Sequence, residues 1–176
     1  MIRKNQAAEL DGVRRVAELM CVAARTAPKA RGHDQIVTAI VEDAGDRELI
    51  AQRMVEIGER ADAEFFIRDA ENLRNAPLAV ILGTGTERLE IPGCSFCGHA
   101  GCVEAEKAGT LCAYNAGDLG IAVGSAVSVA ADHRVDNRIM YTIGNAVVEM
   151  GLLGEDISIA YGIPLSARGK NPFFDR

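Results

Sequence analysis

The stretch PLAVILG, from Pro77 to Gly83, decides the fold that the sequence predicts. Its apolar residues run almost without interruption, between a proline and a Gly-Thr-Gly turn, and the run is too short for a buried helix. A run of this kind is typical of a strand that is covered on both faces. We therefore predict an interior strand here, in a sheet with helices packed against it.

The rest of the chain supplies another strand and several helices. Gln35–Val41 is short, β-branched and apolar, as a second buried strand should be. Apolar residues recur every three or four positions along Leu10–Arg25, which predicts an amphipathic helix. The other expected elements are a helix capped by Asp46 and running to Arg60, an irregular helix over 64–76, helices over 115–131 and 136–150, a strand over 157–161, and an extended arm over 162–176.

These elements predict one α/β (α+β) domain over residues 1–176, with a small mixed sheet of at least three strands flanked by helices. A chain of 176 residues is long enough to bury a core without the help of a metal. Within this domain, residues 91–115 form a cysteine-rich segment that we expect to be a metal-binding loop.

Composition and charge argue against several classes of function. The net charge is -6 and the chain has no lysine and arginine cluster, so neither nucleic acid nor a membrane surface is an expected partner. The apolar run Leu119–Ala131 is shorter than the roughly 20 residues that span a membrane. The N-terminal residues lack the apolar core of a signal peptide, so we expect a cytoplasmic protein with reduced thiols.

Cysteines carry the strongest functional signal. Cys94, Cys97, Cys102 and Cys112 lie within nineteen residues, in the pattern C-x2-C-x4-C-x9-C. In a reducing compartment this clustering favours metal ligation over disulfides. The fifth, Cys21, lies on the apolar stripe of the first helix, where a buried cysteine acts as a small hydrophobic residue.

The spacing favours an iron–sulfur cluster without excluding other chemistry. Glycines within the loop permit tight turns and let backbone N–H groups approach the sulfides of a cluster. A structural zinc site commonly has two close cysteine pairs, and only the first pair exists here. We therefore favour a 4Fe–4S cluster, with zinc, or with thiols that are redox-active or not involved, as the alternatives.

Three further features bear on function and assembly. Ala116, Gly120, Gly124 and Ser128 recur every four residues and predict a smooth helix face for close packing, within the chain or across a homodimer. Phe173–Phe174 near the chain end are expected to dock on a partner subunit. Polar residues around the later helices are expected to act mainly as caps and in surface ion pairs, and they include Tyr114, Asn115, Asp118, His133, Arg134, Asp136, Asn137 and Arg138.

The chain resembles a family of uncharacterised ferredoxin-domain proteins of archaea and anaerobic bacteria. The residues that carry the likeness are GCSFCGHAGC from Gly93, CAYNAGDLG from Cys112, RVDNRIMYTIG from Arg134 and the tail from Gly162 to Arg176. This resemblance implies that the four clustered cysteines bind an iron–sulfur cluster. The gap before Cys112 is shorter than in the similar 4Fe–4S modules of larger redox complexes.

A second resemblance concerns the first half of the chain. A helix followed by TAPKARGHDQIVTAIV and NAPLAVIL is similar to the opening of flavin-dependent nitroreductases, which are dimers that hold FMN at the subunit boundary. The likeness implies that Arg25, Lys29, Arg31 and Lys170 contact a flavin phosphate. The basic cluster that nitroreductases carry before their first helix is reduced here to Arg3 and Lys4, and a solvated turn is the simpler interpretation of Lys29 and Arg31.

Together these signals predict an iron–sulfur redox protein of the ferredoxin type, homodimeric, with an unknown electron partner. The alternatives are a zinc-stapled binding protein and an FMN-dependent oxidoreductase. Serine- or cysteine-based hydrolysis is not expected, because no catalytic signature surrounds the three histidines of the chain. If the protein is an enzyme, we expect an oxidoreductase.

Overall fold

Strand β2 (Leu78–Thr84) lies inside the sheet, and all of its residues are buried. It pairs antiparallel with β1 (Ile36–Val41) on one side and β4 (Ile159–Ser166) on the other. The short β3 (Asp136–Asn137) flanks β4, so the strand order is β1-β2-β4-β3. The structure is a computed structural model, and it describes residues 4–174. The predicted interior strand is therefore confirmed, within a sheet of four strands.

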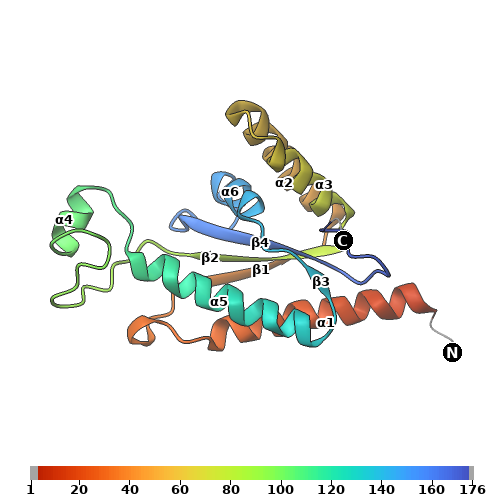
Figure 1. The fold of residues 1–176 in the computed structure, drawn as a ribbon, viewed down its shortest axis with the longest axis horizontal. Helices are drawn as coiled ribbons and strands as arrows, with labels where there is room; N and C mark the ends of the chain where they lie inside the picture. Colours follow the sequence, from red (N-terminus) through yellow and green to blue (C-terminus); the bar gives the residue numbers. More distant parts are fainter. Residues whose placement is uncertain (1–3, 175–176) are drawn as a thin grey trace.

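One face of the sheet packs on the two long helices, α1 (Asn5–Thr26) and α5 (Ala113–Asp132) (Figure 1). Leu78, Val80 and Leu82 of β2 point to this side, in the alternation that a pleated strand imposes. The helices contribute small and medium apolar residues to the same core, among them Val13, Met20, Ala24, Leu119, Ala122 and Ala126.

The other face packs on α2 (Ala44–Ala61), α3 (Glu64–Asn75) and α6 (Tyr141–Glu149). The alternate residues of β2, Ala79 and Ile81, point to the opposite face and into this second core. Its other members include Ile50, Met54, Phe66, Leu73, Ile143 and Val147. The molecule therefore has three layers with a core on each side of the sheet, which confirms the expected fold class.

The sheet is not mixed as expected, because every pairing among the described strands is antiparallel. The reason lies in the connection from β1 to β2. It consists of two helices, α2 and α3, which pack against each other as a hairpin. A helical hairpin returns the chain to the end of the sheet at which β1 finished, so β2 runs in the opposite direction, whereas a single crossover helix would have made it parallel.

Several element boundaries differ from the sequence-based expectation. Asp43, and not Asp46, caps α2, because its carboxylate accepts hydrogen bonds from the backbone N–H groups of Gly45 (2.7 Å) and Asp46 (3.1 Å). The segment 64–76 is a regular helix and not an irregular one. Asp136 caps no helix, because it and Asn137 pair with the edge of β4, and α6 begins only at Tyr141.

The segment after Tyr161 is not an extended arm. Residues 162–166 continue β4, because alternate side chains, Ile163 and Leu165, enter the core beneath α1 and α5. Phe173 is 2% exposed and packs in the core on the α2–α6 side, with Phe174 against it. Arg138 fastens this tail, since its guanidinium donates to Phe173 O (2.9 Å) and lies over the Phe174 ring. The expectation of docking on a partner subunit is therefore wrong for Phe173, and for Phe174, which is half-buried, it stays a prediction.

Helix α6 approaches β4 so closely that only glycine fits at the contact. A Cβ atom on Gly144 would overlap the backbone of Ala160. A Cβ atom on Gly162 would likewise overlap the side chain of Ile143. The two glycines thus fix the distance between the helix and the sheet on this face.

We predict that Gly144→Ala lowers the free energy of unfolding by about 3 kcal/mol, because backbone has to move to accept the methyl group. Gly12→Ala is a matched control within α1, where an added Cβ meets nothing within 4 Å. The control should raise stability by up to about 1 kcal/mol through helix propensity. Urea denaturation of both variants tests this, and an unchanged midpoint for Gly144→Ala would contradict the close contact.

Candidate metal centre

The four clustered cysteines meet around one small cavity. Cys94, Cys97, Cys102 and Cys112 all line it, together with Phe96, Tyr114 and neighbouring backbone. Each is a half-buried free thiol. The structure therefore brings together the four residues that the sequence spacing selected, from a loop and two helix starts. Cys21 packs against the core beneath α1 and α5, as expected for a small hydrophobic residue.

Two helix starts and a series of tight turns place these thiols. Cys102 is the first residue of α4 (Cys102–Lys107), and Cys112 is the N-cap residue of the 20-residue helix α5. Thiolate character is stabilised at the N-terminus of a long helix by its unpaired N–H groups and its dipole. Three loop glycines have positive φ, at Gly93 (72°), Gly98 (85°) and Gly109 (65°), and other residues would be strained there.

Four thiols can serve as ligands of an iron–sulfur cluster or of a zinc ion. In residues 4–174 no group of three or more His, Cys, Asp or Glu side chains is arranged to hold a single metal ion. In a cluster each thiolate binds a different iron, so the sulfur atoms lie farther apart than around one zinc ion. The cavity measures only about 20 Å³, about the space of one water molecule. The four thiols are a donor set that fits a cluster.

Thr110 ties the two ends of the cysteine loop together. Arg88, before the loop, donates through Nη2 to the backbone oxygen of Thr110 (2.9 Å). Nε2 of His99, within the loop, lies 2.9 Å from the hydroxyl oxygen of Thr110. Because Thr110 is two residues before Cys112, this junction positions the last of the four thiols. His99 itself does not line the cavity, so it supports the loop and is not placed as a ligand.

A second junction anchors the loop to the sheet. The side-chain amide of Asn115 donates to the backbone oxygens of Gly85 (2.9 Å) and Glu87 (3.1 Å). Gln35, just before β1, accepts from the N–H of Glu87 and donates to the oxygens of Glu87 and Asn115. Asn115 is 3% exposed, so these bonds are shielded from water. The strand that leads to the cysteines is thus locked to the helix that follows them.

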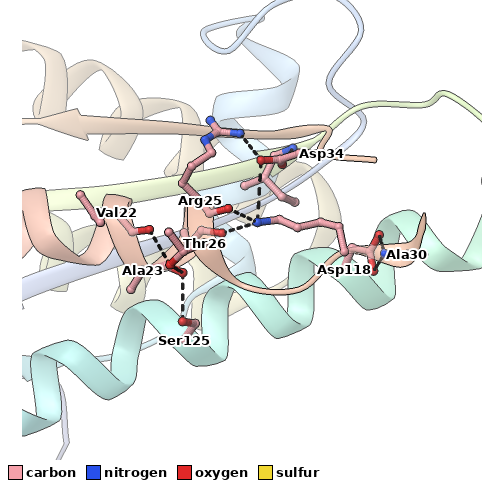
Figure 2. A network of polar contacts seen from close by, with 11 residues as sticks. Val22, Ala23, Arg25, Thr26, Ala30, Asp34, Asp118 and Ser125 are labelled. Atoms are coloured by element: carbon pink, nitrogen blue, oxygen red, sulfur yellow. Dashed lines mark hydrogen bonds and ion pairs between the residues drawn. The ribbon is translucent and has the colours of Figure 1, made fainter. Parts of the chain in front are cut away.

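Asp118, one turn further along α5, holds the segment after α1. Both of its carboxylate oxygens accept from the backbone N–H of Ala30, at 3.0 and 3.1 Å (Figure 2). Asp118 is 8% exposed. Asn115 and Asp118 are therefore buried cross-links between elements, and both are exceptions to the expectation that these polar residues act mainly as caps or in surface ion pairs.

The cations expected to contact a flavin phosphate have partners within the chain. Lys29 donates to the backbone oxygens of Ala24 (2.6 Å) and Arg25 (2.7 Å), the last carbonyls of α1, and its side chain is 3% exposed. Arg25 pairs with Asp34 at 2.6 Å, as Figure 2 shows. Arg31 donates to Leu89 O (2.9 Å). In this arrangement the ammonium group of Lys29 is not available to a phosphate.

The fourth expected flavin contact, Lys170, lies elsewhere. Arg31 lies just before β1. The first residue of β1, Ile36, pairs with Thr84 of β2, and Thr84 also pairs with the first residue of β4, so Arg31 lies near the end of the sheet at which β4 begins. Lys170 follows the last residue of β4, at the opposite end of the sheet, and is exposed. A strand of this length spans about 20 Å, so within one chain the four cations do not form one phosphate site. Their contact with FMN stays a prediction.

Sequence reasoning missed Arg88, Thr110 and Gln35. Neither their residue types nor their spacing gave a signal, because each acts on backbone atoms that only the fold brings near. The glycine-rich setting of the loop was a usable signal for the turns themselves, and three of these glycines do have positive φ.

Comparison with known proteins places the chain by family and by fold. A family described as "uncharacterized protein containing a ferredoxin domain" matches residues 108–176, a part that includes Cys112 but not the three earlier cysteines. A relative from Archaeoglobus fulgidus, called an uncharacterized protein, is 42% identical over 174 residues, covering 94% of this chain and 92% of the relative. That alignment spans nearly the whole chain.

Solved structures with a similar fold are nitroreductase-fold proteins. A putative NADH dehydrogenase/NAD(P)H nitroreductase from Bacteroides thetaiotaomicron has a TM-score of 0.60 at 15% identity, covering 99% of this chain and 94% of its own. The hypothetical oxidoreductase YcnD from Bacillus subtilis has a TM-score of 0.60 at 14% identity. The chain covers 59% of YcnD, and 90% of this chain is matched. At these identities the likeness establishes the fold alone.

None of the helices within residues 4–174 has both the length and the apolarity that crossing a membrane requires.

The Asp34 contacts predict an acid-dependent loss of stability. Burial raises the pKa of Asp34, but hydrogen bonds from Arg25 and the Ile36 N–H, with the charge of Lys29, outweigh it and hold the pKa below the ordinary 3.8. A lowered pKa stabilises the fold above the ordinary value, and that contribution is lost as the pH falls through the folded-state pKa.

Asp34→Asn should therefore cost stability at pH 7 and progressively less as the pH falls below about 3.8. The measurement is chemical denaturation of both proteins across this range. Asp156→Asn, at an exposed carboxylate, is the control and should show little effect at any pH. A stability difference that stays constant down to about pH 2 would rule out the charge as its source.

Proposed function

Because the chain belongs to the family of uncharacterised proteins that contain a ferredoxin domain, we propose that it is an iron–sulfur protein that transfers electrons. Cys94, Cys97, Cys102 and Cys112 would hold a 4Fe–4S cluster. The observation that carries this proposal is that these four cysteines, and no other ones, line a single cavity. Four thiolates are the usual ligand set of such a cluster.

The cluster, when bound, supplies a one-electron couple, and the chain supplies its surroundings. The cavity opens at the surface, where Phe96 is 69% exposed and its ring lies tilted against that of Tyr114. Arg88 lines the same cavity and brings a positive charge near the thiols. Solvent exposure and nearby charge are among the factors that set the reduction potential of a cluster. These residues would therefore tune that potential and form the surface on which a partner protein binds.

A second candidate function is an FMN-dependent oxidoreductase, which the fold favours. The likeness covers almost the full length of both chains in one nitroreductase. A similar structure is titled an oxidoreductase containing FMN, with a TM-score of 0.60. Against this candidate, Lys29 and Arg25 are engaged within the chain and Lys170 lies at the far end of the sheet. We therefore rank flavin chemistry second.

We also propose that the protein is a homodimer joined through the outer face of α5. The predicted row Ala116, Gly120, Gly124 and Ser128 is exposed, and a Cβ atom on either glycine meets nothing of its own chain within 4 Å. Exposed Ile121 on α5 and Leu19 and Val22 on α1 add apolar surface. Within residues 4–174 neither glycine packs against another element, so close approach of a second copy would explain why these glycines are present.

We also propose that the protein is cytoplasmic. Its five cysteines are free thiols, and thiols stay reduced in that compartment.

Serine replacement of each clustered cysteine tests the main proposal. Protein purified without oxygen should contain about four iron and four sulfide per chain and absorb broadly near about 400 nm. Cys94→Ser, Cys97→Ser, Cys102→Ser and Cys112→Ser should each lose most of this iron and absorbance. Cys21→Ser is the matched control and should keep both, because Cys21 packs against the apolar core and does not line the cysteine cavity.

Other outcomes of the same experiment favour the alternatives. One zinc per chain with no redox response would identify a zinc-stapled binding protein, and a yellow chromophore released on denaturation would identify the FMN enzyme. Wild-type protein that is colourless and free of iron after anaerobic purification would overturn the cluster.

The dimer makes a separate prediction. Gly124→Arg should leave the chain folded, because its site faces open space, and should turn a dimer into a monomer. Gln52→Arg, on the exposed side of α2, is the control and should remain dimeric. Size-exclusion chromatography with light scattering measures both, and a monomeric wild-type protein would remove this part of the proposal.

A further inference from the structure

A second, larger cavity lies beside the cysteine cavity. It has a volume of about 330 Å³, within the range of small-molecule sites, and it is lined by Arg31, His33, Glu87, Arg88, Leu89 and Glu90. Two segments form it, the turn between α1 and β1 and the chain that leaves β2 for the cysteine loop. All of these residues except Leu89 carry an ionisable side chain.

Arg88 lies between the two cavities, since it is a lining residue of both. Its Nη2 is bound to Thr110 O, whereas its Nε atom is buried without a hydrogen-bond partner among the described residues. Arg31 faces the same cavity with one nitrogen bound to Leu89 O. Each guanidinium group has five N–H donors, so both retain donors for a ligand.

The acidic residues of this cavity are not equivalent. Nε2 of His33 lies 2.9 Å from a carboxylate oxygen of Glu87, so this acid already has a partner. Glu90 is exposed at the rim and offers an acceptor. The cavity thus presents two cationic forks together with a carboxylate, which suits a ligand that carries both acidic groups and hydrogen-bond donors.

The backbone of the cavity is held in an unusual conformation on both walls. Arg31 (φ 57°) and Glu90 (φ 47°) are two of the four non-glycine residues with positive φ in residues 4–174. Such a conformation is unfavourable for a residue that carries a Cβ atom. Strain of this kind persists where surrounding contacts impose it, and it concentrates at ligand sites.

We propose that this cavity binds a small carboxylic acid that also carries a hydroxyl group, with its carboxylate groups on Arg31 and Arg88 and its hydroxyl group on Glu90. A ligand held there lies against the residue that also borders the four cysteines. Binding itself needs no metal, so the site stands or falls independently of the proposed cluster.

Two of the three histidines, His33 and His133, allow a test on the chain without substitutions. His33 lines the cavity, whereas His133 is the C-cap residue of α5, at the end of the helix away from the cysteines. Titration of metal-free protein at low salt with malate, followed by NMR of the imidazole ring signals, should shift the His33 signals in a saturable way and leave those of His133 in place. The His33 signals are assigned as those that are missing from the spectrum of the His33→Gln variant.

Probe chemistry and variants make the test specific. Succinate, which lacks the hydroxyl group of malate, should bind several-fold more weakly, and Glu90→Gln should reduce this preference. Arg31→Gln and Arg88→Gln should each weaken malate about tenfold or more, as loss of a charged hydrogen bond does, with partial recovery in the lysine variants. Arg15→Gln, on the exposed side of α1, is the matched control and should bind as the wild type does.

Two results would overturn the proposal. One is no change at His33 with either acid in wild-type protein. The other is a His33 response to inorganic phosphate or FMN but not to malate, which would make the cavity a phosphate site. Loss of cluster binding in the cysteine variants with malate binding retained would show that the two sites are separate.

Discussion

Burial of β2 on both faces is the constraint on which the rest of the structure depends. All seven of its residues are buried, and their side chains alternate between the two cores. A strand with no solvated face needs a layer on each side, so helices have to cover both faces of the sheet. The α2–α3 hairpin and the α1–α5 pair meet this need, and Gly144 and Gly162 bring α6 into contact on the first of these sides.

Side-chain hydrogen bonds to the backbone tie the chain that leaves this strand to the elements beside the cysteines. The chain leaves β2 at Thr84, and Asn115 and Gln35 hold the next residues by their peptide groups. Asn115 lies three residues after Cys112, so the same side chain fixes the approach to the loop and the exit from it. Between these points the loop consists of turns and the six-residue α4. The side-chain anchors lie at the two ends of this loop.

Much of the fold could be predicted because periodicity reports directly on burial. The strands over 35–41 and 78–83 and the helix over 115–131 were recognisable from apolar runs alone, and each lies within about two residues of its predicted bounds. Prediction failed where a pairing strand or a packing core elsewhere in the chain decides the structure of a segment. Asp136–Asn137 form a strand only because β4 offers them an edge, and Phe173 is buried only because the α2–α6 core has room for it.

The sequence by itself determined the two-sided burial of β2 and the selection of four cysteines, since both are local in the chain and depend on residue type and spacing. The tertiary structure alone decided which polar residues support the cysteines and where the expected cations lie. Arg88 meets Thr110 across 22 residues and Gln35 meets Glu87 across 52, and Lys170 is carried away from Arg31 by the length of β4. Such contacts depend on how the layers stack, and no local pattern records that.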